Sequence, residues 1–155
     1  MLRRAGLHAL RTLLELAKDP GRWRSVNGIA LAQELPAPML EQVLLKLRRA
    51  GLVEARRGRK GGYRLSKPAS AIAVGEVLRA VGAGINLTAR PTASEPDNGE
   101  GPADGRAEQR VLYSMGRRLQ AALEKELNAL SIEELLFDLS SWQESLSNEG
   151  GVMLG

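Results

Sequence analysis

Apolar residues recur at helical spacing in three successive stretches at the start of the chain. Residues 4–18 predict a first helix with an apolar stripe of Leu7, Leu10, Leu14 and Ala17. An Asp-Pro-Gly run at 19–21 ends it. Ser25 is a suitable N-cap for a second helix that extends to about Glu34, with Ile29, Ala32 and Leu35 inward. A proline-containing turn then leads into a third helix that ends near Ala50, and its apolar face comprises Met39, Leu40, Val43, Leu44 and Leu47.

The pattern changes after this third helix. Residues 52–56 and 63–66 are short strand candidates, and the glycine-rich basic stretch 57–62 between them predicts a β-hairpin. A fourth helix is marked by Val74, Val77, Leu78 and Val81. The order of these elements predicts a winged helix-turn-helix domain in residues 1–83, because it runs helix, helix, turn, helix and basic hairpin. The expected fold class is therefore mainly α with a small β-hairpin wing.

The second half of the chain is organised around one long amphipathic helix. Residues 84–107 keep no apolar period and are predicted to be a flexible loop or linker. A helix from about 107 to 130 follows, and its apolar stripe comprises Leu112, Met115, Leu119, Leu123 and Leu127. This stripe packs either into an intramolecular core or against a second copy as a dimer seam. A capping-box sequence at 131–134 opens a last short helix that ends near Leu139. The polar tail 140–155 is expected to fray.

Charge is unevenly divided between the two halves. Residues 1–67 carry fifteen Lys and Arg against five Asp and Glu, a net charge of +10, whereas residues 68–155 carry seven against thirteen, a net charge of −6. A basic half beside an acidic half suggests a polyanion-binding domain joined to a different one. The chain contains no run of about 18 apolar residues, which is the length needed to span a membrane. No signal peptide is evident, so we expect a cytoplasmic protein with no membrane partner.

The candidate chemistry lies on the third helix and on the wing. A helix fits the major groove of B-DNA, and the wing places five cations in nine residues: Arg56, Arg57, Arg59, Lys60 and Arg64. The wing glycines lack the spacing of a nucleotide-binding loop, and a solvated hairpin tip is the alternative interpretation. Phosphate contacts are also expected at the chain start and at the second helix N-terminus. The expected DNA-contacting residues are Arg3, Arg4, Ser25, Pro38, Met39, Glu41, Gln42, Lys46, Arg57, Gly58, Arg59, Lys60, Gly61, Gly62 and Tyr63.

Three segments carry a resemblance to a known family: LEQVL at 40–44, LRRAGLV at 47–53 and RGRKGGY at 57–63. With them the chain resembles the bacterial Rrf2 (BadM-type) regulators, a family that includes an iron–sulfur cluster regulator and a cysteine-metabolism repressor. The resemblance implies a homodimer in which the long helix crosses to its partner, and a roughly palindromic operator. It also implies that Glu41 and Gln42 touch bases and that Arg57 reaches the minor groove. It favours the dimer seam for the stripe at 112–127.

The departures from this family concern metal binding. Many members hold an iron–sulfur cluster with three cysteines in the loop before the long helix, but this chain contains no cysteine. A cluster bound in that way is chemically impossible here, so we expect no cofactor and no metal. His8 stands where the family usually has tyrosine, which leaves a non-cysteine site as a minor alternative. A histidine that faces a dimer or DNA surface is the simpler interpretation.

These observations predict a homodimeric transcriptional repressor that binds double-stranded DNA. Its signal is expected to come from a regulatory protein partner, from a small ligand or from neither. The runner-up is a winged-helix module that binds protein rather than DNA, which would have no need for five cations on the wing. No nucleophile–base pair, clustered carboxylates or cofactor loop is present, so we do not expect an enzyme.

Overall fold

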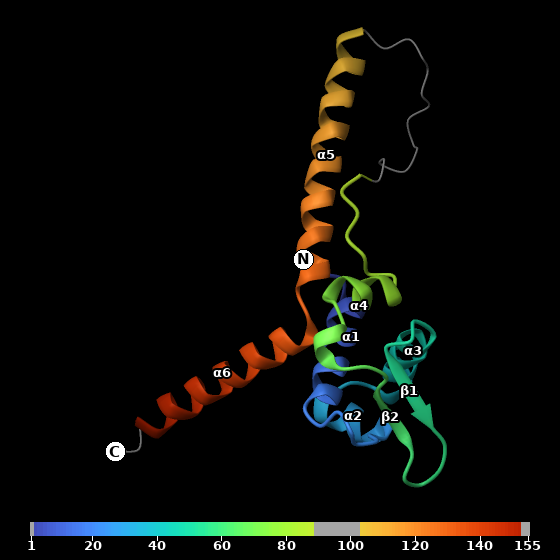
Figure 1. Cartoon of the computed structure of the whole chain (residues 1–155), viewed down its shortest axis with the longest axis vertical. Coiled ribbons are helices and arrows are strands. Elements are labelled where there is room, and N and C mark those ends of the chain that lie inside the picture. Colours follow the sequence, from blue (N-terminus) through green and yellow to red (C-terminus); the bar gives the residue numbers. More distant parts are fainter. Residues whose placement is uncertain (1, 89–102, 153–155) are drawn as a thin grey trace. The chain divides into compact units, whose positions relative to one another are not determined.

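The computed structural model describes residues 2–88 and 103–152 of the chain (Figure 1). Two compact units are distinguished, one comprising residues 1–84 and 128–155 and the other residues 85–127. The first unit contains α1 to α4, the two-stranded sheet and α6, whereas most of α5 belongs to the second. Most of the linker predicted at 84–107 lies outside the described residues, and its character stays a prediction.

Helix α1 (Arg4–Ala17) is the central helix of the first unit. It packs against α2, α3, α4 and α6, so its buried face is wide: Ala9, Leu10, Thr12, Leu13, Glu15, Leu16 and Ala17. The predicted stripe is only partly right, because Leu7 is 39% exposed and Leu14 is half-buried. A helix that is contacted by neighbouring elements on several sides buries more than one stripe of residues. The spacing of the leucines alone does not show which additional positions are buried.

Helices α2 (Val26–Gln33) and α3 (Ala37–Arg49) form the helix-turn-helix. Ser25 caps α2 as predicted, because its Oγ accepts a hydrogen bond of 3.0 Å from the backbone N–H of Gly28. Glu34 ends α2 in the left-handed conformation, with φ of 53°, which reverses the chain toward α3. Ile29 is buried as expected, but Ala32 is exposed. The turn therefore holds α3 across α2 on the surface of the unit.

The wing consists of β1 (Val53–Arg56) and β2 (Gly62–Leu65), which pair antiparallel with Val53 opposite Leu65. Arg24 adds a bridge to this hairpin, since its N–H donates to the Tyr63 carbonyl oxygen at 2.9 Å and its carbonyl oxygen accepts from the Tyr63 N–H at 2.8 Å. Gly62 makes that approach possible. Its φ is +135°, and a Cβ there would lie 2.1 Å from the carbonyl oxygen of Arg24. The predicted β-hairpin wing is thus confirmed and is joined to the chain before α2.

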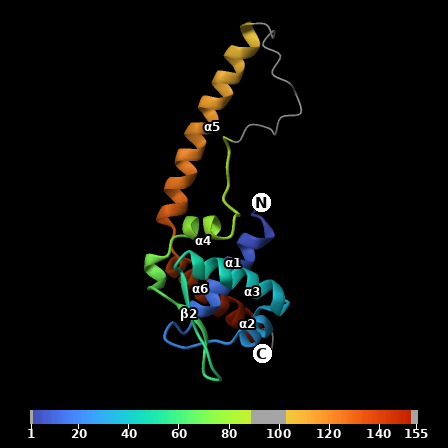
Figure 2. The ribbon, with the colours of Figure 1, turned by 90° about the vertical axis from the view of Figure 1, so that its right-hand side faces the viewer.

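A short turn η1 (Ala69–Ala71) and α4 (Val74–Ala80) follow the wing. The backbone N–H of Val74 donates to the carbonyl oxygen of Leu130 at 2.8 Å, and that of Ile132 donates to the carbonyl oxygen of Ile72 at 2.9 Å. Ile72 and Ile132 are both fully buried. These bonds join the start of α6 (Ile132–Val152) to the winged domain, and α6 packs against α1, which it crosses in the view of Figure 2.

Helix α6 begins as predicted but is longer than predicted. The Oγ of Ser131 accepts a hydrogen bond of 3.2 Å from a first-turn N–H, which is the expected cap. The expectation that the chain frays after Leu139 is wrong, because the helix continues well beyond this residue. Trp142 and Leu146 extend the apolar spacing of the first half of α6, and no proline interrupts it before the glycines at 150 and 151.

Helix α5 (Ala103–Ala129) dominates the second unit and begins four residues before the predicted 107. Residues 85–88 lie along it, because Gln120 accepts a hydrogen bond from the N–H of Leu87 at 2.8 Å and donates one to the carbonyl oxygen of Ile85 at 3.0 Å. Gly116 allows this approach, since a Cβ there would lie 3.0 Å from the carbonyl oxygen of Leu87. Across the described parts of the chain, neither α5 nor any other helix is long and apolar enough to cross a membrane.

Candidate nucleic-acid interface

Helix α3 separates a buried face from a polar one. Its buried residues, Leu40, Val43, Leu44 and Leu47, face the core and fix the orientation of the helix. The predicted contact residues all lie outside this stripe and are exposed: Pro38, Met39, Glu41, Gln42 and Lys46. The assignment of Met39 to the apolar face is wrong, because this side chain lies beyond the edge of the buried stripe and is 39% exposed. Within the described residues the side chains of Glu41, Gln42 and Lys46 make no hydrogen bond or ion pair. They are therefore available to the base edges and phosphates of a groove.

The wing tip is a short cationic loop held by glycines. Arg57, Arg59 and Lys60 are exposed, and their side chains make no hydrogen bond or ion pair with another described residue. The loop closes through a hydrogen bond of 3.0 Å from the N–H of Gly61 to the carbonyl oxygen of Gly58. A Cβ at Gly61 would lie 2.0 Å from the carbonyl oxygen of Arg56, so this glycine is required by space. The tip thus presents three charged side chains on a tightly constrained backbone.

Two other wing cations are held by Trp23, a role that no pattern in the sequence indicates. The guanidinium carbon of Arg64 lies 4.2 Å from the centroid of the Trp23 ring, and that of Arg56 lies 5.8 Å from it. Arg64 also forms an ion pair with Glu54 on the opposite strand. Cation–π contacts of this kind contribute about 0.5–2 kcal/mol each. Trp23 therefore supports the strands of the wing, whereas the three cations of the tip make no contact of this kind with a described residue.

A second feature without a sequence signal is the carboxylate of Glu15, a residue that is only 7% exposed. It accepts hydrogen bonds from Lys18 at 2.9 Å, Arg24 at 3.2 Å and Gln33 at 3.0 Å. Burial alone would raise the pKa of this carboxyl, but the hydrogen bonds and charges of Lys18 and Arg24 outweigh burial and hold the pKa below its ordinary value of 4.5. Gln33 in turn binds the guanidinium of Arg11. The cluster fixes α1, α2 and the bridge residue Arg24 relative to one another.

The remaining predicted contact residues lie on separate elements, at the N-terminus of α2, on β2 and at the start of α1. Ser25 is exposed at the N-terminus of α2, where first-turn N–H groups can face a phosphate. Tyr63 is half-buried and pairs through its backbone with Arg24. Arg3 and Arg4 are exposed at the start of α1, the end opposite to the one that carries Glu15, and their DNA contacts stay a prediction.

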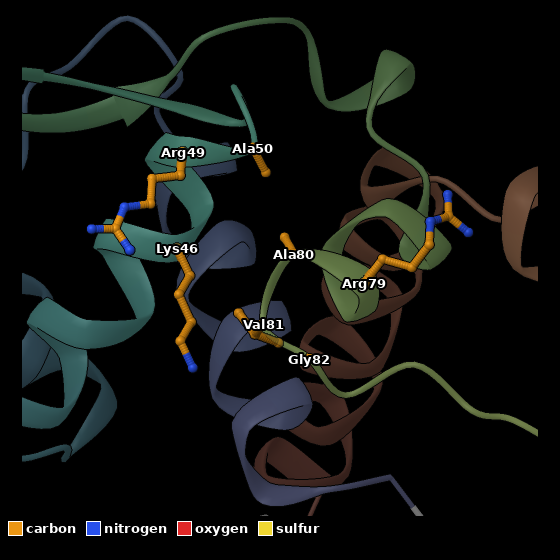
Figure 3. A pocket seen from close by; sticks show the side chains of 7 residues that line it. All are labelled: Lys46, Arg49, Ala50, Arg79, Ala80, Val81 and Gly82. Carbon is orange, nitrogen blue, oxygen red and sulfur yellow. The ribbon is translucent and has the colours of Figure 1, made fainter.

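A shallow depression of about 500 Å³ lies between the C-terminal ends of α3 and α4 (Figure 3). Three of its lining residues are cations: Lys46, Arg49 and Arg79. Figure 3 shows their charged ends directed away from one another, and the guanidinium of Arg79 donates to the side chain of Asn128 at 3.4 Å. The charges do not converge on one point, so the depression is not a built anion site.

The exposed α3, the capped α2 and the cationic wing define a winged helix-turn-helix protein of the DNA-binding class. The model of the Rrf2 family, described as "Iron-dependent Transcriptional regulator", matches residues 2–138. The chain therefore belongs to the Rrf2 family and is a DNA-binding transcription regulator.

Relatives and solved structures agree with this assignment. The chain is 35% identical over 137 residues to the Synechocystis protein slr0846, whose name places it among HTH-type transcriptional regulators, and this match covers 88% of the chain and 87% of that protein. It is 34% identical over 138 residues to the regulator IscR of Vibrio atlanticus, covering 86% and 73% of the two chains. The structure of CymR, the global cysteine regulator of B. subtilis, superposes with a TM-score of 0.65 at 30% identity and covers 88% of this chain and 95% of that one.

The family description names iron, and the residues of this chain do not fit it. Iron–sulfur clusters in proteins are held chiefly by cysteine thiolates, and the sequence contains no cysteine. In residues 2–88 and 103–152 no group of three or more His, Asp or Glu side chains could hold a metal ion. His8 is half-buried on α1, and its carbonyl oxygen accepts a hydrogen bond of 2.7 Å from the hydroxyl of Thr12. The side chains of this chain therefore do not supply the thiolate ligands that a family cluster requires.

Proposed function

We propose that the protein represses transcription as a homodimer that binds a nearly palindromic operator, without a cysteine-ligated cluster. The observation that carries this proposal is the exposed polar face of α3 together with three free cations at the tip of the hairpin that follows it. Figure 1 shows α3 next to the hairpin, and the two elements pack together. A surface that combines groove-reading side chains with phosphate-binding ones suits duplex DNA.

The two elements have different tasks in this proposal. Helix α3 enters the major groove, where Gln42 can pair with adenine and Glu41 can accept a hydrogen bond from the amino group of cytosine. Lys46 and the N-terminus of α2 contact phosphates. The wing tip extends along the duplex so that Arg57 enters the minor groove, while Arg59 and Lys60 contact the backbone. Base contacts then supply specificity, and the phosphate contacts supply most of the affinity.

Self-association through α5 supplies the second half of the site. Leu112 is 60% exposed in the single chain, and Met115 and Leu119 are each 51% exposed. Leu123 and Leu127 continue the same stripe and are half-buried. Exposed apolar side chains that recur along one helix face mark an interaction site. A second copy that packs against this stripe would present two α3 helices to two half-sites about one helical turn apart.

Binding of the full-length protein to a fluorescent random duplex, measured by anisotropy at several salt concentrations, tests this function. For Z neutralised phosphates, the logarithm of the affinity should fall with the logarithm of salt concentration at a slope of about −0.9Z. In vitro selection from random duplexes should then recover two inverted half-sites. A slope near zero with no selected sequence would favour a module that binds protein.

A matched pair of charge substitutions locates the contact. Arg57→Ala should weaken binding to the selected duplex by about 1–3 kcal/mol. Lys125→Ala, which removes a charge from an exposed position on α5, should leave the affinity close to that of the parent. Equal effects of both substitutions would show that net charge rather than the wing determines binding.

A further inference from the structure

Leu45 is an apolar side chain on the polar face of α3. It is 43% exposed, whereas the four core residues of the helix are buried. At 100° per residue, Leu45 lies about 150° around the helix from the centre of the buried stripe. Gln42 precedes it by three positions and Arg49 follows by four, so all three lie along the same outward line. Leu45 is therefore directed to whatever α3 binds.

This inference rests on the proposed binding of α3 to duplex DNA. Single exposed leucines are common on protein surfaces and have no meaning by themselves. Position distinguishes this one, because it lies among Glu41, Gln42 and Arg48, whose side chains form no hydrogen bond or ion pair within the described residues. A leucine there has neither a donor nor an acceptor to offer a base edge.

We propose that Leu45 reads a thymine by contact with its C5-methyl group. Among the groups that bases expose in the major groove, this methyl is the apolar one. Against an edge of guanine, adenine or cytosine, the same leucine would cover polar atoms without pairing them, which is unfavourable. Leu45 thereby both favours thymine and disfavours the other bases at one position of each half-site.

The position of this thymine follows from helix geometry. Three residues separate Leu45 from Gln42, which is about 4.5 Å along the axis at 1.5 Å per residue. Successive bases of one strand are about 3.4 Å apart. The thymine should therefore lie within one or two base pairs of the base that loses its preference when selection is repeated with Gln42→Ala.

Replacement of thymine by deoxyuridine tests the contact, because uracil lacks only the methyl group. Each thymine of the duplex recovered by selection is replaced in turn, and the affinity of the full-length protein is measured by anisotropy. One thymine per half-site should weaken binding about fourfold when replaced, and about fifteenfold when both copies are replaced, as expected for one buried methyl group in each. With Leu45→Ala the same replacements should change affinity less than twofold.

Two further variants separate this contact from a general effect. Leu31→Ala removes an exposed leucine from α2 and should keep the full deoxyuridine effect. Leu45→Gln keeps a helix-forming residue but adds polar groups, and selection with it should lose the thymine preference. If the deoxyuridine effect persists in Leu45→Ala, or if no thymine is sensitive in the parent protein, the proposal is wrong while the recovered operator still supports the function. If no duplex is recovered at all, the proposed function fails as well.

Discussion

Substitution of Leu119 by glutamate should convert the protein into a monomer. Full burial of a leucine contributes about 1.5–3 kcal/mol, and about half of this side chain is still exposed in the single chain. Covering the exposed half in a dimer is worth about 1 kcal/mol per copy and about 2 kcal/mol for the symmetric pair. Alanine alone should therefore weaken dimerisation about thirtyfold.

Glutamate should have a larger effect than alanine. It loses the same apolar contact and places two carboxylates at the seam, where burial of an unpaired charge costs several kcal/mol more. Ala121→Glu is the matched control, because Ala121 is exposed on the opposite side of α5 and receives the same charge.

Sedimentation velocity over a wide concentration range measures the outcome. The parent protein and Ala121→Glu should sediment as dimers, and Leu119→Glu should sediment as a monomer with unchanged helical circular dichroism. The monomer should bind a duplex with two half-sites no more tightly than a duplex with one. A Leu119→Glu protein that stays dimeric at every concentration would show that the α5 stripe is not the seam.

Three further substitutions test the support of the wing. Gly62→Ala should destabilise the protein by about 3 kcal/mol in urea, because the new Cβ would displace the backbone of Arg24, which pairs with the wing, whereas Gly21→Ala, with nothing within 4 Å, should cost little. Because the folded pKa of Glu15 lies below 4.5, its contribution is present above pH 4.5 and is lost as pH falls through the folded pKa. Glu15→Gln should flatten the decline of urea stability in that acid range, and an unchanged decline would contradict this role. Trp23→Leu should lower stability by about 1 kcal/mol through lost cation–π contacts, an effect that the exposed Trp142→Leu should not share.

Helical and strand periodicity sufficed to predict much of the winged domain. The buried stripe of α3 follows from the spacing of Leu40, Val43, Leu44 and Leu47, and the outward face is its complement. The hairpin follows from a glycine-rich basic run between two strand candidates. Both are local signals, in which neighbouring residues carry the information. The exposure of Glu41 and Gln42 could be predicted for that reason, although their DNA contacts stay a prediction.

Features that depend on distant contacts could not be predicted in the same way. Glu15 meets Arg24 and Gln33 across nine and eighteen positions, and no local pattern links these residues. The buried face of α1 was partly misassigned, because several helices surround α1 and cover positions outside its leucine stripe. The end of α6 was misplaced because a run of serine and glutamate resembles a frayed tail, whereas the spacing of Trp142 and Leu146 continues the helix.

Contacts within the fold reduce the number of wing cations that remain free to bind phosphate. The sequence places five cations on the hairpin, but Arg64 lies over the indole ring of Trp23 and pairs with Glu54, while Arg56 lies farther from the same ring. These contacts stiffen the wing, and the ion pair with Glu54 offsets the charge of Arg64 alone. Arg56 and the three tip cations remain without an ion pair to another described residue, so the wing should contribute at most about 3.6 per protomer to the salt slope, at 0.9 for each phosphate. The affinity of the protein for DNA therefore depends on which cations the fold leaves free and not on the basic composition of the segment.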